Sequence, residues 1–143
     1  MISSRRILVG LKTADQADQL MELAAALGGP ETTLLLVHVI ELPDVTPLDA
    51  EVPDLVSAAE EILARAESFA HQRGMSAKTE ILRAHGAASA LVDEMRVHKI
   101  DLAILGYHHG RKLSEIVFGT TASHMAKQAP CRIVMNIPPR EER

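Results

Sequence analysis

The chain has 143 residues and a mass of 15.5 kDa, the size of one globular domain, so we treat residues 1–143 as a single domain. Hydrophobic residues make up 47% of the chain and charged residues 24%, a composition that excludes intrinsic disorder. The net charge of −4 and the aromatic content of 2% argue against nucleic-acid binding, because that function needs basic patches or aromatic stacking platforms.

The first residues do not predict a targeting signal. The apolar run from Ile7 to Leu11 stops at Lys12, whereas a signal peptide needs roughly 7–15 apolar residues in its middle region. No stretch approaches the ~20 apolar residues of a membrane span. The single cysteine, Cys131, excludes an intramolecular disulfide. We therefore expect a cytoplasmic protein without membrane insertion.

Short apolar runs alternate with longer amphipathic runs along the chain, and these patterns predict strands and helices respectively. The predicted strands cover residues 6–11, 33–40, 78–83, 102–105 and 131–137. The predicted helices cover residues 15–27, 54–73 and 87–98 and the end of the segment 107–128. A proline-rich acidic loop over residues 43–53 is predicted to be the most flexible segment, and its role is left open.

Helical spacing also predicts which helix residues face the core. The residues expected to be buried in the first two helices are Ala17, Leu20, Met21, Ala24 and Leu27, then Leu55, Ala59, Ile62, Ala66 and Phe69. In the third helix, Ala88, Leu91, Val92 and Met95 are expected to point inward, while Asp93 and Glu94 face solvent.

The regular order of strands and helices predicts an α/β fold. Strands that are separated by helices pair in parallel through right-handed crossovers. We therefore expect an open, doubly wound sheet of five parallel strands with helices on both faces. Ligands on such sheets bind beyond the carboxyl ends of the strands, where the strand order reverses. Residues 10–13, residues 39–42 and the loop after Leu105 should then surround one crevice.

The segment after the fourth predicted strand holds the most informative motif. Three of the chain's eight glycines lie there: Gly106, Gly110 and Gly119. Thr120 and Thr121 then precede a short helical pattern, and free amides at a helix start bind anions. Arg111 and Lys112 would add positive charge. A phosphate cradle is one interpretation, and a flexible turn with a threonine N-cap is the other.

This segment resembles the universal stress protein family, which carries Gly-x2-Gly-x9-Gly-(Ser/Thr) after its fourth strand. Gly106, Gly119 and Thr120 match the first, third and fourth positions, whereas His109 replaces the second glycine and Gly110 follows it. Further stretches resemble the family's strands: Arg6-Ile-Leu-Val, Leu36-Val-His-Val-Ile, Asp101-Leu-Ala-Ile-Leu-Gly and Cys131-Arg-Ile-Val-Met. The resemblance covers nearly the whole chain and implies a Rossmann-like fold of the adenine nucleotide alpha-hydrolase type.

The resemblance also implies an adenine-nucleotide site that takes ATP or AMP, with Mg²⁺ accompanying ATP. The phosphate and ribose contacts would fall on Gly106, Gly110, Gly119, Thr120 and Thr121. The adenine would lie near Val39. The remaining candidate binding residues are Gly10, Leu11, Lys12, His109 and Arg111. Where the family places an aspartate after its first strand, this chain has Lys12, so a carboxylate has become a cation.

Two functional hypotheses follow from these residues. The first is a non-catalytic, nucleotide-binding regulatory module of the stress response, with at most slow ATP hydrolysis, because the sequence shows no poised base or nucleophile. The alternative is a homodimeric interaction module with a vestigial nucleotide site and an unidentified protein partner, a hypothesis that Lys12 and His109 motivate. An enzyme that transfers adenylyl groups or electrons would need acid/base or redox groups that the sequence lacks.

The seven histidines do not predict a metal site. No His-Glu-x-x-His motif is present, and Cys131 has no second cysteine. His38 lies in an apolar strand and is interpreted as a hydrogen-bonded core residue. His71 and His98 lie near helix ends, where positive charge is favourable.

The last predicted strand suggests a partner surface. It runs from Cys131 to Ile137, is mostly apolar and should lie at an edge of the sheet. An exposed apolar edge pairs readily with another chain, and members of the family commonly dimerise there. We therefore expect a homodimer formed through this strand, with the alternative that the chain's own tail covers the edge.

Overall fold

The computed structural model describes residues 5–106 and 120–139, and strands and helices alternate in it as predicted. The strands are β1 (Arg6–Gly10), β2 (Thr33–Glu41), β3 (Ser76–Ala84), β4 (Leu102–Gly106) and β5 (Arg132–Asn136). The helices are α1 (Ala14–Leu27), α2 (Pro53–Gln72), α3 (Ala87–Val97) and α4 (Thr120–Gln128). No helix in these two ranges is long and apolar enough to cross a membrane.

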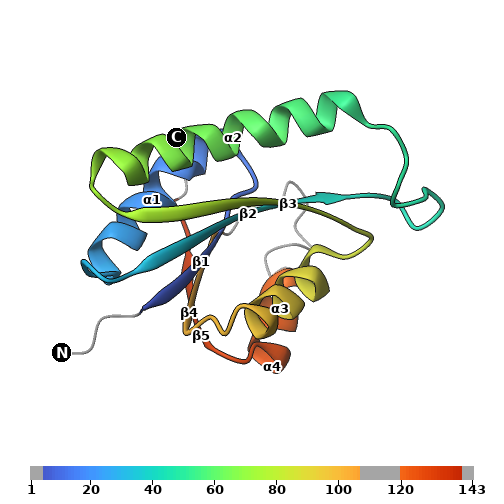
Figure 1. Ribbon diagram of the computed structural model, residues 1–143. Helices are drawn as coiled ribbons and strands as arrows, with labels where there is room; N and C mark the ends of the chain where they lie inside the picture. Colours follow the sequence, from blue (N-terminus) through green and yellow to red (C-terminus); the bar gives the residue numbers. More distant parts are fainter. Residues whose placement is uncertain (1–4, 107–119, 140–143) are drawn as a thin grey trace.

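The strands form one parallel sheet in the order β3-β2-β1-β4-β5. Helices α1 and α2 lie on one face of the sheet, and α3 and α4 lie on the other (Figure 1). The chain winds outward from β1 to β3 and then crosses back to β4 on the far side of β1. This reversal confirms the predicted doubly wound architecture and places its switch point between β1 and β4.

The central strands are apolar because both of their faces are covered. On β2, Leu34 and Leu36 pack in the core beneath α1 and α2, whereas Leu35 and Val37 pack in the core beside α3. Successive side chains of a strand point to opposite faces, so a continuous apolar run fills both cores. Together these two cores hold the carboxyl ends of the strands in fixed positions.

The helix faces agree with the prediction except at two leucines and at Glu94, whose side chain is only 16% exposed. Leu27 is 40% exposed and Leu55 is 47% exposed, so both expectations of burial are wrong. Leu27 is the last residue of α1, where the chain turns away from the sheet at Gly28. Leu55 lies in the first turn of α2, and Val56 packs at that end of the core instead.

An ion pair joins the two helices of one face. Arg65 on α2 donates from Nε to Oδ1 of Asp18 on α1 at 3.0 Å, and from Nη2 to Oδ2 at 2.7 Å. This hydrogen-bonded guanidinium lowers the pKa of the Asp18 carboxyl. Both side chains are about half-exposed, so the pair contributes little to stability. It fixes the relative positions of α1 and α2 at the surface.

The loop that follows β2 is tied to the edge of the sheet. Arg83 on β3 donates from Nη1 to the carbonyl oxygens of Leu48 at 3.3 Å and Ala50 at 2.5 Å. The tip of the loop projects into solvent, and Val45 is 93% exposed. These two hydrogen bonds anchor the second half of the loop, whose flexibility remains a prediction.

Candidate functional site

The carboxyl ends of β1, β2 and β4 lie next to one another, as the prediction of a single crevice requires. Gly10, the last residue of β1, pairs with Val37 of β2 on one side and Leu105 of β4 on the other. The turn after β1, residues 11–13, therefore leaves the sheet at the switch point. Ligands of doubly wound sheets bind at this place.

Gly10 and Gly106, at the ends of β1 and β4, must be glycines because side chains of the core lie directly against their backbone. A Cβ on Gly10 would lie 2.6 Å from Cδ2 of Leu105. A Cβ on Gly106 would overlap Oε1 of Gln16, a side chain of α1 that is only 7% exposed. Any larger residue would therefore displace a buried side chain or the end of its own strand.

Two hydrogen bonds fix the peptide groups of Leu11 in the turn after β1. Its backbone N donates to the carbonyl oxygen of Val37 at 2.8 Å. Its carbonyl oxygen accepts from Nδ1 of His38 at 2.7 Å, so the neutral ring carries its proton on Nδ1. This contact confirms the interpretation of His38 as a hydrogen-bonded residue. It also gives His38 a positioning role at the crevice that its place in an apolar strand did not predict.

The turn then presents one cation and one hydroxyl before α1 begins. The Lys12 side chain is exposed, whereas the Leu11 side chain is buried. Thr13 is the N-cap of α1, but its side chain makes no capping hydrogen bond. Its Oγ1 atom is buried and has no hydrogen-bond partner among the described residues. A cation and an unsatisfied hydroxyl beside a helix start are groups that an anionic ligand with polar substituents would satisfy.

The remaining predicted site residues divide into two groups. Val39 lies near the end of β2, two residues beyond Val37, and is partly buried against the α3 side of the sheet. Thr120 and Thr121 are the first two residues of α4, whereas the prediction placed both before the helix. The other candidates lie outside the described residues, namely His109, Gly110, Arg111, Lys112 and Gly119.

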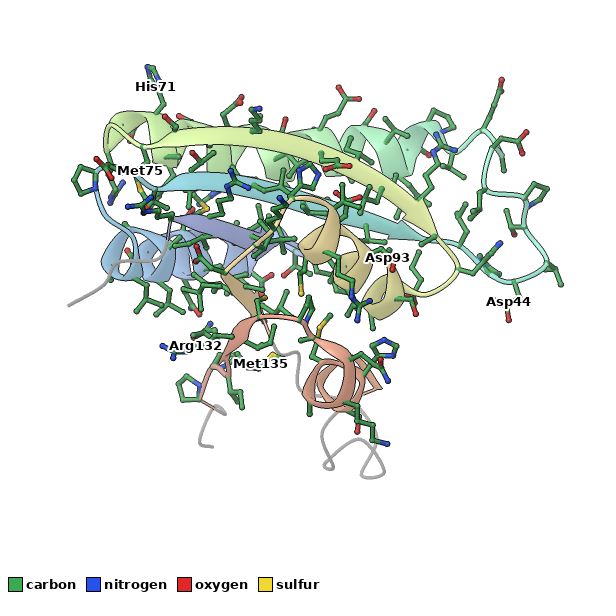
Figure 2. The ribbon with its side chains drawn as sticks, turned by 60° about the horizontal axis from the view of Figure 1, so that its bottom comes forward. Asp44, His71, Met75, Asp93, Arg132 and Met135 are labelled. Atoms are coloured by element: carbon green, nitrogen blue, oxygen red, sulfur yellow. The ribbon has the colours of Figure 1, made fainter. Side chains whose placement is uncertain are left out.

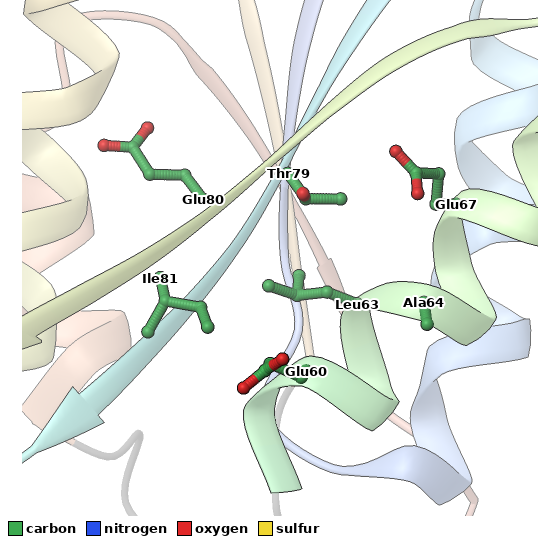
Figure 3. Close-up of a pocket in the computed structure, with 7 residues that line it drawn as sticks. All are labelled: Glu60, Leu63, Ala64, Glu67, Thr79, Glu80 and Ile81. Atoms are coloured by element: carbon green, nitrogen blue, oxygen red, sulfur yellow. The ribbon is translucent and has the colours of Figure 1, made fainter. Parts of the chain in front are cut away.

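A separate groove of about 400 Å³ lies between α2 and the edge strand β3. Figure 3 shows Glu60, Leu63 and Glu67 on α2 facing Thr79 on β3. The carboxylates of Glu60 and Glu67 line it, so its charge opposes phosphate binding, and Glu80 borders it from β3 with its side chain turned to the other face of the strand. The groove lies along the side of the sheet and is distinct from the crevice at the strand ends.

Strand β5 forms one edge of the sheet and carries the predicted partner surface. Its hydrogen-bonded partner is β4, and the described residues place no strand on its outer side. Arg132 and Met135 lie on this outermost strand in Figure 2. At its end, Asn136 donates from Nδ2 to Oε1 of Gln19 on α1 at 3.0 Å. Burial raises the pKa of the neighbouring Cys131 thiol, which packs as a small apolar residue.

Solved structures of similar fold come from distant organisms. UspA of Lactobacillus plantarum is 22% identical, with a TM-score of 0.65 and coverage of 94% of this chain and 99% of the other. A universal stress protein of Archaeoglobus fulgidus in complex with dAMP is 18% identical, with a TM-score of 0.65 and coverage of 94% and 98%. A family member of Arabidopsis thaliana with AMP bound is 13% identical, with a TM-score of 0.67 and coverage of 94% and 92%.

These likenesses establish the fold alone, because each sequence identity is below 25%. A comparison with curated protein sequences gives no significant match. The model of the universal stress protein family matches residues 3–135, which include β1 to β4 and all of β5 except Asn136. The chain therefore belongs to the universal stress protein family.

Proposed function

We propose that this protein is a non-catalytic regulatory module that binds an adenine nucleotide at the switch point between β1 and β4. The observation that carries the proposal is the turn after β1. There Lys12 is exposed, the Thr13 hydroxyl lacks a partner among the described residues, and both peptide groups of Leu11 are fixed. The AMP and dAMP bound to two structures of the same fold support this choice of ligand class.

The chemistry of the described residues supports binding without catalysis. The imidazole of His38 contacts the turn, and its Nδ1 atom donates to the Leu11 carbonyl oxygen. Neither Lys12 nor Thr13 is paired with a described carboxylate that could activate water. We expect nucleotide binding to change a surface that partner proteins recognise, because a ligand selects among the conformations of a protein.

Calorimetric titration of nucleotide-stripped protein with MgATP and, separately, with AMP tests the proposal. Micromolar binding or better, about −8 kcal/mol, would support a nucleotide module. A protein that gives no heat up to millimolar nucleotide at two temperatures would contradict it. The same samples, assayed for release of phosphate and AMP, test the absence of catalysis, and steady turnover would overturn that part.

The substitution Lys12→Ala should weaken ATP binding more than AMP binding. Lys12 stands where the family usually has an aspartate, and its ammonium group can donate a hydrogen bond to a phosphate oxygen. ATP carries two more phosphates than AMP, so ATP should lose more affinity. We expect about a tenfold loss of ATP affinity, because a hydrogen bond to a charged group contributes roughly 1.5–3 kcal/mol. The salt dependence of binding should weaken as well. Isothermal titration at two ionic strengths measures both effects.

Lys78→Ala is the matched control, because Lys78 is exposed on the amino-terminal half of β3, far from the strand ends. Equal ATP affinities in the two variants would remove Lys12 from the site.

The alternative function is a homodimeric interaction module that binds no ATP. Replacement of the expected carboxylate by Lys12 favours it, because a cation cannot accept hydrogen bonds from ribose hydroxyls. The open outer edge of β5 supplies the surface for pairing with a second copy. Both functions are compatible with a dimer, so nucleotide titration distinguishes them, and the dimer measurement tests the interface that they share.

The dimer is best tested at Ile137, which is 48% exposed just beyond β5. Val134 is less suitable, because it packs against the core beneath α1 and a charge there would also destabilise the fold. We expect Ile137→Lys to shift the protein from dimer to monomer in sedimentation velocity. Val97→Lys is the control, since Val97 is 71% exposed at the end of α3. A dimer that survives Ile137→Lys would place the interface elsewhere.

A further inference from the structure

Three potential metal ligands converge on the face of the sheet that α3 covers. Glu80 lies on the edge strand β3, Glu94 lies on α3, and His98 is the C-cap of that helix. One ligand atom from each residue lies within 4.8 Å of the other two. Figure 3 shows Glu80 pointing away from Thr79 and out of the acidic groove, toward the opposite face of β3. The cluster therefore shares only Glu80 with the lining of the groove, and it is separate from the crevice at the strand ends.

The local backbone fixes two of the three side chains on one turn of helix. The backbone N of His98 donates to the carbonyl oxygen of Glu94 at 3.0 Å, so helical geometry continues as far as His98. Residues four apart on a helix lie on the same face. Nε2 of His98 consequently lies 2.9 Å from Oε2 of Glu94 and 3.6 Å from Oε2 of Glu80.

These distances suit a shared tetrahedral ion. Zinc binds His nitrogen and carboxylate oxygen at about 2.0–2.2 Å, which places neighbouring ligand atoms of a tetrahedron roughly 3.3 Å apart. The two distances from His98 lie on either side of that value. The three protein ligands would leave a fourth position for water. Small rotations of Glu80 and Glu94 would bring all three atoms around one ion.

The charges at this cluster are unbalanced. Glu94 has a side chain only 16% exposed, and Glu80 is 31% exposed. Within the described ranges no lysine or arginine is ion-paired with either carboxylate, and the imidazole of His98 is the basic group beside them. Arg6 approaches the cluster but donates to the backbone carbonyl of His98. Two partly buried carboxylates beside one imidazole would be neutralised by a divalent ion.

One carboxylate oxygen of the cluster accepts no hydrogen bond from the described residues. Oε2 of Glu94 is inaccessible to solvent, and no donor of the described residues makes a hydrogen bond to it. Nε2 of His98 is close to this oxygen but does not meet hydrogen-bond geometry. A buried oxygen of this kind calls for a partner. We propose that Glu80, Glu94 and His98 bind a divalent transition-metal ion of the Zn²⁺ class, which joins the end of α3 to the edge strand β3.

The imidazole decides the class of ion. Carboxylates alone favour Mg²⁺ or Ca²⁺, whereas an imidazole with carboxylates favours Zn²⁺ and similar ions. The sequence did not predict this site, because Glu80 comes from a strand fourteen positions before Glu94 and no short motif contains all three residues. The expectation that Glu94 faces solvent is wrong, because its side chain is only 16% exposed and lies beside His98.

Co²⁺ is a suitable probe, because a tetrahedral nitrogen and oxygen site gives it a visible absorption spectrum. The untagged, full-length protein is treated with chelator and titrated with Co²⁺ in the absence of nucleotide. We expect saturable absorption, reversal of the signal by Zn²⁺, and an increase of the melting temperature in Zn²⁺. Glu94→Gln and His98→Gln should each weaken binding at least about tenfold, since loss of even an outer-shell partner costs 10–100-fold.

The chain offers a matched control on α2. Glu67 and His71 have the same spacing as Glu94 and His98, and both are exposed. His71 projects outward near the end of α2 (Figure 2), and the described residues offer no third ligand beside it. Glu67→Gln and His71→Gln should leave Co²⁺ binding unchanged.

Three results would overturn the proposal. They are no saturable Co²⁺ spectrum in the wild-type protein, wild-type affinity in Glu94→Gln and His98→Gln, and equal losses in the α2 variants. Glu80→Gln is the further variant for the case that a substitution on α3 impairs folding, because Glu80 lies on an edge strand. Circular dichroism of each apo variant separates loss of a ligand from loss of the fold. If any of the three results is obtained with folded protein, Glu80, Glu94 and His98 form only an ion-pair cluster and bind no metal.

Discussion

Replacing Leu36 by alanine should lower the free energy of unfolding by about 2–5 kcal/mol, the range for removing a fully buried leucine side chain. Leu36 is 0% exposed and lies in the middle of β2, between Val9 of β1 and Thr79 of β3. The substitution removes apolar contacts and leaves a cavity that rigid neighbouring strands cannot close. Equilibrium urea unfolding of the wild type and the variant measures the difference.

Leu27→Ala is the control for this experiment, because it removes the same atoms from a side chain that is 40% exposed at the end of α1. We expect a loss of less than about 1 kcal/mol there, since a surface substitution leaves no cavity. Similar losses at the two leucines would mean that the core beneath α1 and α2 relaxes freely.

The substitution Gly106→Ala should destabilise the protein by about 1–3 kcal/mol, the usual cost of overpacking a filled core. The added Cβ would occupy the place of the Gln16 side-chain oxygen. Because Gln16 is buried on α1, it can move only by displacing its own neighbours, and Cδ1 of Leu20 also lies 3.5 Å from the added Cβ. Chemical denaturation of the single variant measures the cost.

A double-mutant cycle then tests the cause. Gln16→Ala removes the side chain that Gly106→Ala would meet, so the double variant should be more stable than the sum of the two single losses predicts. Strictly additive losses would show that the strain at Gly106 arises elsewhere. Nucleotide titration of the folded variants adds a readout of the crevice, because Gly106 ends the strand from which the candidate binding loop leaves.

The strands could be predicted because both faces of the central sheet are buried. Continuous apolar runs such as that of β2 have no other favourable place, and the alternation with helices then restricts the topology. The ends of the helices and the solvent exposure of individual side chains were harder to predict. Leu27 and Leu55 fit the helical period, but the period does not indicate where a helix runs past the core it covers.

The location of the candidate site at the switch point could be predicted from the sequence. The contacts between its side chains could be predicted less well. The glycines at strand ends marked the switch point, because their positions follow from the strand pattern itself. The roles of Gln16 and His38 could not be predicted, since each depends on a residue that is adjacent only after folding. The same is true of Glu80 and His98, which come from a strand and a helix of the same face.

The central position of β1 has a consequence for the order of events during folding. Among the five strands of the sheet, β1 is synthesised first and lies in the middle, and its neighbour β4 is made only after β2, β3 and three helices. This non-local pairing slows folding and delays closure of the sheet, because loop-closure entropy opposes it. Until β4 arrives, the edge of β1 that borders the crevice is open. A ligand at the switch point would therefore stabilise only chains in which β4 has paired with β1. A nascent or truncated chain that lacks β4 would not bind the ligand.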